Sequence, residues 1–92
     1  MTQTAESTVP KFAAGVRLQY DKVRAAWILQ APERVIIPDE TALESLQRCD
    51  GRASLAAIID ALAAAYDERR DVIAEDVCNL VNELVEKGIL SR

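Results

Sequence analysis

Hydrophobic and polar residues alternate over residues 16–21, where the sequence reads VRLQYD. A period of two is typical of a β-strand with one buried face, so we expect a strand here. Residues 25–31, AAWILQA, predict a second strand that is apolar on both faces apart from Gln30. The intervening DKVR is polar and predicts a hairpin loop.

A third, shorter strand is expected in the sequence RVIIP, residues 34–38. Pro32 and Glu33 suit the two central positions of a turn before it, because proline presets the backbone angle needed at the first of them. Pro38 ends the strand, since proline has no N–H group to donate to a neighbouring strand.

The hydrophobic period becomes helical after residue 38, and three helices are expected. Asp39, Ser54 and Asp71 are the expected N-caps of these helices. Apolar residues follow each cap at spacings of three and four, as on the buried face of an amphipathic helix, and Gly88 ends the third helix. The pattern therefore predicts an α+β fold that is winged-helix-like, with three short antiparallel strands followed by three helices.

The chain has 92 residues, half of them apolar, which is enough for one small domain. Residues 1–11 are polar and lack periodicity, so we expect a mobile N-terminal tail before a single domain over residues 12–92. Ile89 and Leu90 are expected to fold back on the core of that domain. No apolar run is long enough to span a membrane and no signal-peptide pattern is present, so a cytoplasmic location without membrane contact is expected.

The sequence LQRCDGRAS, residues 46–54, predicts a corner between two helices. Gly51 stands where the end of a helix favours a residue that can adopt a positive φ. Cys49 lies on the apolar stripe of the preceding helix, and the chain has no histidine that could activate it. We therefore expect Cys49 to be a buried, poorly reactive thiol, whose pKa is raised by the adjacent Asp50.

Residues suited to catalysis are scarce. The chain lacks histidine, a CxxC pair, a glycine-rich phosphate loop and any cluster with metal-ligand spacing, so we expect no enzyme activity, metal or cofactor. The expected third helix also opposes DNA binding, because its charges would repel phosphates: it carries Lys87 against Asp71, Glu75, Asp76, Glu83 and Glu86. A module that binds another protein or peptide is the favoured class.

Three segments resemble one known family in order and spacing. The sequences APERVIIPDE, LQRCDGRASLAAIIDALAAAY and IAEDV, with a final KGIL, are similar to the PqqD family of pyrroloquinoline quinone (PQQ) biosynthesis. The resemblance implies a single peptide-recognition domain over residues 12–92, related in fold to winged helices. It further implies an adaptor that binds the precursor peptide PqqA and presents it to PqqE, a radical S-adenosylmethionine enzyme.

The resemblance also implies how the peptide binds. Related recognition domains take it as an added strand on the open edge of their third strand, in a groove completed by their third helix. Here that strand supplies the candidate peptide-binding residues Arg34, Val35, Ile36 and Ile37. The alternative for the three apolar residues is a plain core role, which is expected for one face of the strand in any case.

The third helix offers two flanks as the other wall of the groove. One is apolar and includes the candidates Cys78, Val81 and Val85, and the other includes the candidate Asp76 with Glu83 and Lys87. Periodicity leaves open which flank faces the third strand. Two other functions also remain open: a homodimer or larger oligomer that uses the same surfaces, and a winged-helix transcriptional regulator.

Overall fold

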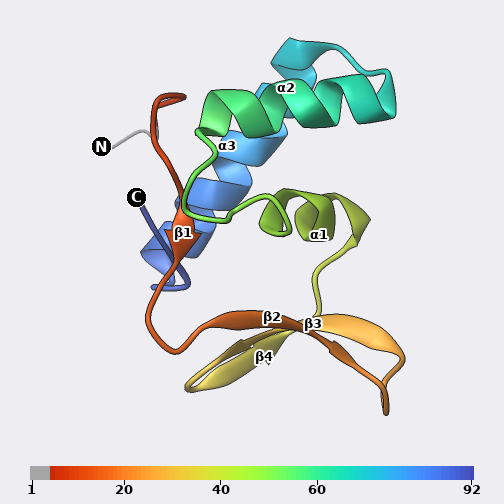
Figure 1. Ribbon diagram of the computed structural model, residues 1–92, viewed down its shortest axis with the longest axis vertical. Coiled ribbons are helices and arrows are strands. Elements are labelled where there is room, and N and C mark those ends of the chain that lie inside the picture. Colours follow the sequence, from red (N-terminus) through yellow and green to blue (C-terminus); the bar gives the residue numbers. More distant parts are fainter. Residues whose placement is uncertain (1–4) are drawn as a thin grey trace.

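The three strands of the main sheet come before the three helices, as the pattern predicts, and the computed structural model describes residues 5–92 (Figure 1). The elements are, in chain order, β1 (Lys11–Phe12), β2 (Arg17–Asp21), β3 (Ala26–Ala31), β4 (Arg34–Ile36), α1 (Glu40–Leu46), α2 (Leu55–Tyr66), α3 (Arg70–Glu86) and β5 (Leu90–Ser91). The α+β prediction of three antiparallel strands followed by three helices is confirmed. No helix in this described part is long and apolar enough to cross a membrane.

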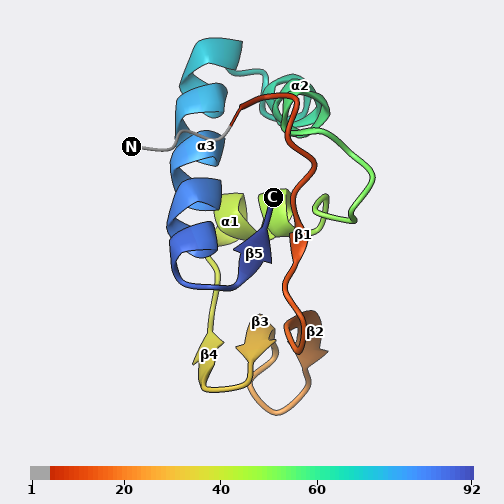
Figure 2. The same ribbon diagram turned by 90° about the vertical axis from the view of Figure 1, so that its left-hand side faces the viewer.

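β3 is the central strand of an antiparallel sheet in the order β2-β3-β4. Leu29 of β3 lies opposite Leu18 of β2 on one side and Ile36 of β4 on the other. These three side chains pack in or against the hydrophobic core, so the face of the sheet that carries them is the one toward the helices. Figure 2 shows β4 at the edge below the carboxyl-terminal end of α3, and β2 at the other edge below β1.

The core lies between this face of the sheet and the three helices. α2 and α3 each contribute apolar side chains spaced three and four residues apart, which places them on one buried face, and α1 contributes Leu46. The buried core residues are Leu29, Leu46, Cys49, Leu55, Ile58, Ile59, Leu62, Ile73, Val77, Val81, Leu84, Ile89 and Leu90. Ile89 and Leu90 fold back as expected.

Two of the three expected helix caps are confirmed. A carboxylate oxygen of Asp39 accepts the N–H of Ala42 at 2.8 Å, and the hydroxyl of Ser54 accepts the N–H of Ala57 at 3.2 Å. The third prediction was wrong, because the N-cap of α3 is Arg69, whose side chain makes no capping hydrogen bond. Asp71 lies in the first turn instead, where its negative charge still suits the helix dipole.

The corner at Gly51 is confirmed. Gly51 has a φ of +80°, a conformation that is strained for residues with a side chain. A carboxylate oxygen of Asp50 accepts the N–H groups of Arg52 and Ala53, which holds the turn. Cys49 is only 4% exposed, and its thiol donates to the carbonyl of Ser45.

The segment before β1 makes specific contacts, and the mobility expected for residues 1–11 stays a prediction. Its first four residues lie outside the described part. From residue 5 onward the segment passes the start of α2, where the carbonyls of Thr8 and Glu6 accept the N–H groups of Leu55 and Ala56. A segment without periodicity can still be held by its backbone, because helix starts leave N–H groups that need acceptors.

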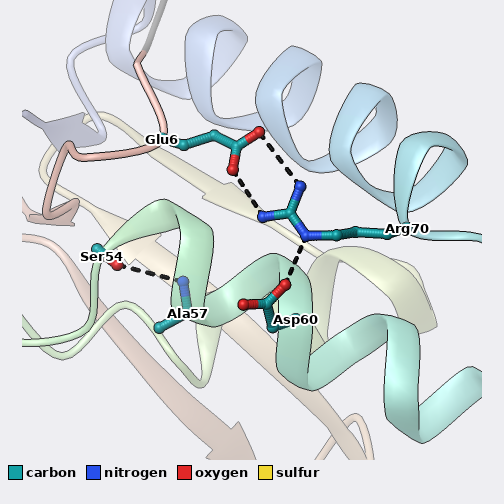
Figure 3. Close-up of polar contacts among 5 residues, drawn as sticks. All are labelled: Glu6, Ser54, Ala57, Asp60 and Arg70. Atoms are coloured by element: carbon teal, nitrogen blue, oxygen red, sulfur yellow. Dashed lines mark hydrogen bonds and ion pairs between the residues drawn. The ribbon is translucent and has the colours of Figure 1, made fainter.

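An ion-pair network also holds this segment. The Arg70 guanidinium donates to the Glu6 carboxylate at 2.6 Å and to the carboxylate of Asp60 (Figure 3). Next along the chain, β1 pairs with β5 in an antiparallel register that sets Phe12 opposite Leu90. Residues 11–12 and 90–91, close to the two ends of the described chain, therefore pair beside α3.

Candidate peptide-binding site

β4 is an edge strand with one side unpaired. It bonds to β3, and no strand within residues 5–92 pairs with its other side. The β3–β4 loop has two residues, so the pair that closes it, Ala31 and Arg34, exchanges both backbone hydrogen bonds. Because hydrogen-bonded and non-bonded pairs alternate, Ile36 also bonds to β3, whereas the N–H and C=O of Val35 point away from the sheet.

The side chains of β4 and of the residue after it alternate between the two faces. Arg34 and Ile36 lie on the face turned toward the helices, and Ile36 packs on the core. Val35 is 49% exposed and Ile37 is 60% exposed, on the opposite face. Ile36 therefore has the core role given above as the alternative to peptide binding, whereas Val35 and Ile37 are exposed.

A hollow of about 280 Å³ lies where β4 begins. One wall is the β3–β4 turn and the start of β4, and the other is the end of α3 and the residues after it. Its lining residues are Ala31, Pro32, Glu33, Arg34, Lys87, Gly88 and Ile89. The charged side chains in this hollow are two cations and one carboxylate.

A second hollow, of about 320 Å³, begins at Asp39, three residues after β4 ends. The start of α1 forms one wall, and the middle of α3 forms the other. Its lining residues are Asp39, Thr41, Ala42, Ser45, Asp76, Asn79 and Leu80. Both of its charged side chains are carboxylates.

The flank of α3 that serves both hollows is the one with Asp76 and Lys87. These residues are 11 apart, which at about 100° per residue returns them to the same line along the helix. Cys78 lies about 200° from Asp76 and is near Glu6 and Arg70, whose charges act on its thiol. The structure therefore brings Arg34, Val35 and Asp76 to the groove side.

The apolar candidates on α3 lie elsewhere. Val81 is a core residue with 1% exposure, and Val85 packs against the core. Cys78 is half-buried beside the N-terminal segment. A role of these three residues in peptide binding stays a prediction. Their positions favour a structural role, in which they pack α3 against the core and the N-terminal segment.

Asp39 and Asn79 line the second hollow but were not among the candidate residues taken from the sequence. The sequence marked Asp39 as a helix N-cap, and that capping hydrogen bond uses only one of its two carboxylate oxygens. Asn79 lies one helical turn from Asp76, so it could have been found once that flank was chosen.

The thiols carry little reactive chemistry. Burial and, to a smaller extent, the charge of the neighbouring Asp50 carboxylate together raise the pKa of the Cys49 thiol to about 11. Desolvation also raises the pKa of the Cys78 thiol. Among residues 5–92, no three His, Cys, Asp or Glu side chains are grouped so that they could hold a metal ion.

The chain is similar to known proteins of one family. The family model for coenzyme PQQ synthesis protein D (PqqD) matches residues 26–90. A protein of Rhodopseudomonas palustris named "PqqA binding protein" is 45% identical over 91 residues, which cover 99% of this chain and 86% of the relative. A protein of the same name from Gluconobacter oxydans is 46% identical over 86 residues, covering 94% and 90%.

Two solved structures are also similar. The solution NMR structure of the PqqD truncation of Methylobacterium extorquens PqqCD has a TM-score of 0.80 at 35% identity, covering 96% of this chain and 94% of that one. It is described as a functional, stand-alone recognition element for ribosomally synthesized and post-translationally modified peptides. The crystal structure of PqqD from Xanthomonas campestris has a TM-score of 0.57 at 44% identity, covering 90% and 92%. The chain therefore belongs to the PqqD family.

Proposed function

We propose that this chain binds the precursor peptide PqqA as a strand added to β4 and presents it to PqqE during PQQ biosynthesis. The observation that carries the proposal is the outward N–H and C=O of Val35 in an edge strand, with one hollow between the end of α3 and the start of this strand and another between the middle of α3 and Asp39, after the strand ends. Family membership supplies the identity of the peptide, because the relatives are named for binding PqqA.

The proposed site divides affinity and specificity between two kinds of groups. Backbone hydrogen bonds to Val35 depend little on the peptide sequence. The residues that line the hollows at the two ends of β4 contact side chains of the peptide, and these contacts select among peptide sequences. Binding through a short edge also keeps the free protein from pairing with unrelated strands, since Pro38 follows closely.

The proposed role is that of an adaptor without catalysis. The reactive groups of the described chain are two thiols with raised pKa values, which supports a division of labour in which PqqE carries out the chemistry. The precursor is made on ribosomes, so we place this step in the cytoplasm. The adaptor is proposed to act without a metal or cofactor of its own.

Proline at position 35 tests the binding mode. Val35→Pro removes the outward donor while leaving the Arg34 and Ile36 hydrogen bonds to β3 in place, so we expect the affinity for PqqA to fall at least about tenfold. Val35→Thr is the matched control, because it keeps the donor and a β-branched side chain. Calorimetric titration of folded Val35→Pro with unchanged affinity would exclude strand addition at this edge.

A homodimer is the alternative use of the same surface. Two copies of β4 could pair edge to edge, and the exposed side chains of Val35 and Ile37 would then flank the new contact. Peptide and second copy would compete for one edge, so PqqA should dissociate any dimer. Sedimentation of the chain with and without peptide separates the two uses.

A further inference from the structure

The two hollows of the groove carry opposite charge. The hollow at the start of β4 has the cations Arg34 and Lys87 against Glu33, and the hollow after its end has Asp39 and Asp76 with no cation in its lining. Neither Arg34 nor Asp76 forms an ion pair within residues 5–92, whereas Lys87 pairs with Glu83 at 3.4 Å. Arg34 and Asp76 are therefore available to a ligand, as are Glu33 in the first hollow and Asp39 in the second, which form no ion pair within these residues either.

The spacing of the two hollows follows from α3, because each contains one residue of the same flank. Asp76 and Lys87 lie on one line of the helix, and 11 residues at a rise of 1.5 Å place them about 16 Å apart. An extended peptide covers that length in about five residues. Side chains of a strand that point toward α3 recur every second residue, so the matching ligand spacing is four or six residues.

The direction follows from the sheet. All three strands of the β2-β3-β4 sheet are antiparallel, and antiparallel pairing is slightly the more stable kind per residue. A peptide antiparallel to β4 enters at the Asp76 hollow and leaves at the Arg34 hollow. Its amino-terminal part thus meets carboxylates, and its later part meets the cation.

We infer, resting on the proposed function, that the groove reads charge order: it takes a peptide with a cationic group in the Asp39–Asp76 hollow and, four or six residues later, a carboxylate in the Arg34 hollow. Backbone pairing depends little on the peptide sequence, and the charges add a preference for one chain direction. They fix both the register and the direction of the added strand.

Charge reversal at each end tests the inference with PqqA as the probe. Arg34→Glu and Asp76→Lys should each weaken binding about threefold to tenfold, and more at low salt than at high salt. The matched controls are Arg52→Glu, in the α1–α2 loop on the side of the molecule away from α3 (Figure 2), and Glu75→Lys, beside Asp76 on the helix. These controls change the net charge equally and should alter affinity less than twofold.

The sign of the two effects is the discriminating result. A peptide attracted only by net charge would bind one reversed variant more weakly and the other more tightly, whereas a charge-ordered groove loses affinity in both. Opposite signs, or effects equal to those of the controls, would overturn the inference while leaving strand addition intact. Absence of PqqA binding to the unaltered chain would instead overturn the proposed function, and the charge order with it.

Spin labels on the peptide test the direction. A label at the amino terminus of PqqA should broaden the amide signals of Thr41 and Ala42 more than those of Glu33 and Arg34, and a label at the carboxyl terminus should do the reverse. The opposite pattern would show a parallel strand and contradict the inferred order.

Discussion

Ile36 of β4 lies directly opposite Leu29 of β3, and the two residues exchange backbone hydrogen bonds across the sheet. This pairing turns the backbone of Ile36 inward and leaves that of Val35 facing the open edge. Proline at the two positions should therefore have different effects on stability. Ile36→Pro should lower the free energy of unfolding by about 1–3 kcal/mol, because it leaves a β3 carbonyl without its donor.

Val35→Pro is the matched control for that prediction, since an edge position tolerates proline when its N–H faces solvent. Urea unfolding of both variants measures the difference. Equal destabilisation by the two substitutions would contradict the alternation assigned to β4.

Gly51 should resist substitution because of its backbone conformation and not because of crowding. An added Cβ would meet the Cβ of Lys11 at 3.6 Å, which is ordinary contact, but the φ of +80° is strained for alanine. Gly51→Ala should therefore destabilise the domain by about 1 kcal/mol. Gly51→Asn should cost less, because asparagine adopts a positive φ more readily, and thermal unfolding ranks the two variants.

The tie between Glu6 and Arg70 should make stability depend on acid pH. The hydrogen bond from Arg70 holds the pKa of the Glu6 carboxyl below its usual range. A depressed pKa adds stability that is complete above the unfolded-state pKa and is lost as the pH falls through the folded-state value. Glu6→Gln should therefore be less stable than the parent at about pH 7 and equal to it at about pH 2.

Stability measured across this pH range, with Glu68→Gln as the control for an exposed carboxylate, checks that prediction. A Glu6→Gln deficit that persists unchanged in acid would contradict a stabilising role for the carboxylate charge, and the absence of any deficit at about pH 7 would show that the backbone alone holds the N-terminal segment.

The two thiols should differ in reactivity. At about pH 8, a pKa of about 11 leaves roughly one Cys49 side chain in a thousand as thiolate, and burial blocks access to it. Cys78 is half-buried and should react first with a thiol reagent. Cys49 should react only as the domain unfolds. The rate of thiol labelling measures this, because Cys78→Ser retains only Cys49 and Cys49→Ser retains only Cys78.

Much of the fold follows from local pattern. The alternation in VRLQYD and the caps at Asp39 and Ser54 are signals carried by a few neighbouring residues, so β2 and the starts of α1 and α2 were predictable. β1 and β5 are two residues each, too short for any period, and they exist because the chain ends meet. The ion pair of Glu6 is with Arg70, which lies 64 residues away in the sequence, and no local pattern predicts such a contact.

The candidate site was predictable only in part, for the same reason. The edge residues of β4 could be named from the resemblance, but the inward turn of Ile36 depends on the two-residue loop closing on Arg34. The choice between the flanks of α3 depends on tertiary packing, which sets Asp76 toward Asp39 and Cys78 toward Glu6. A helical wheel presents both flanks equally.

Amide hydrogen exchange at Val35 tests strand addition most directly. In the free chain the Val35 N–H points to solvent, while those of Arg34 and Ile36 already donate to β3. NMR-detected exchange with saturating PqqA should show a gain in protection at Val35 that is at least about tenfold larger than the gain at Ile36. A saturated complex in which Val35 exchanges as fast as in the free chain would contradict the account.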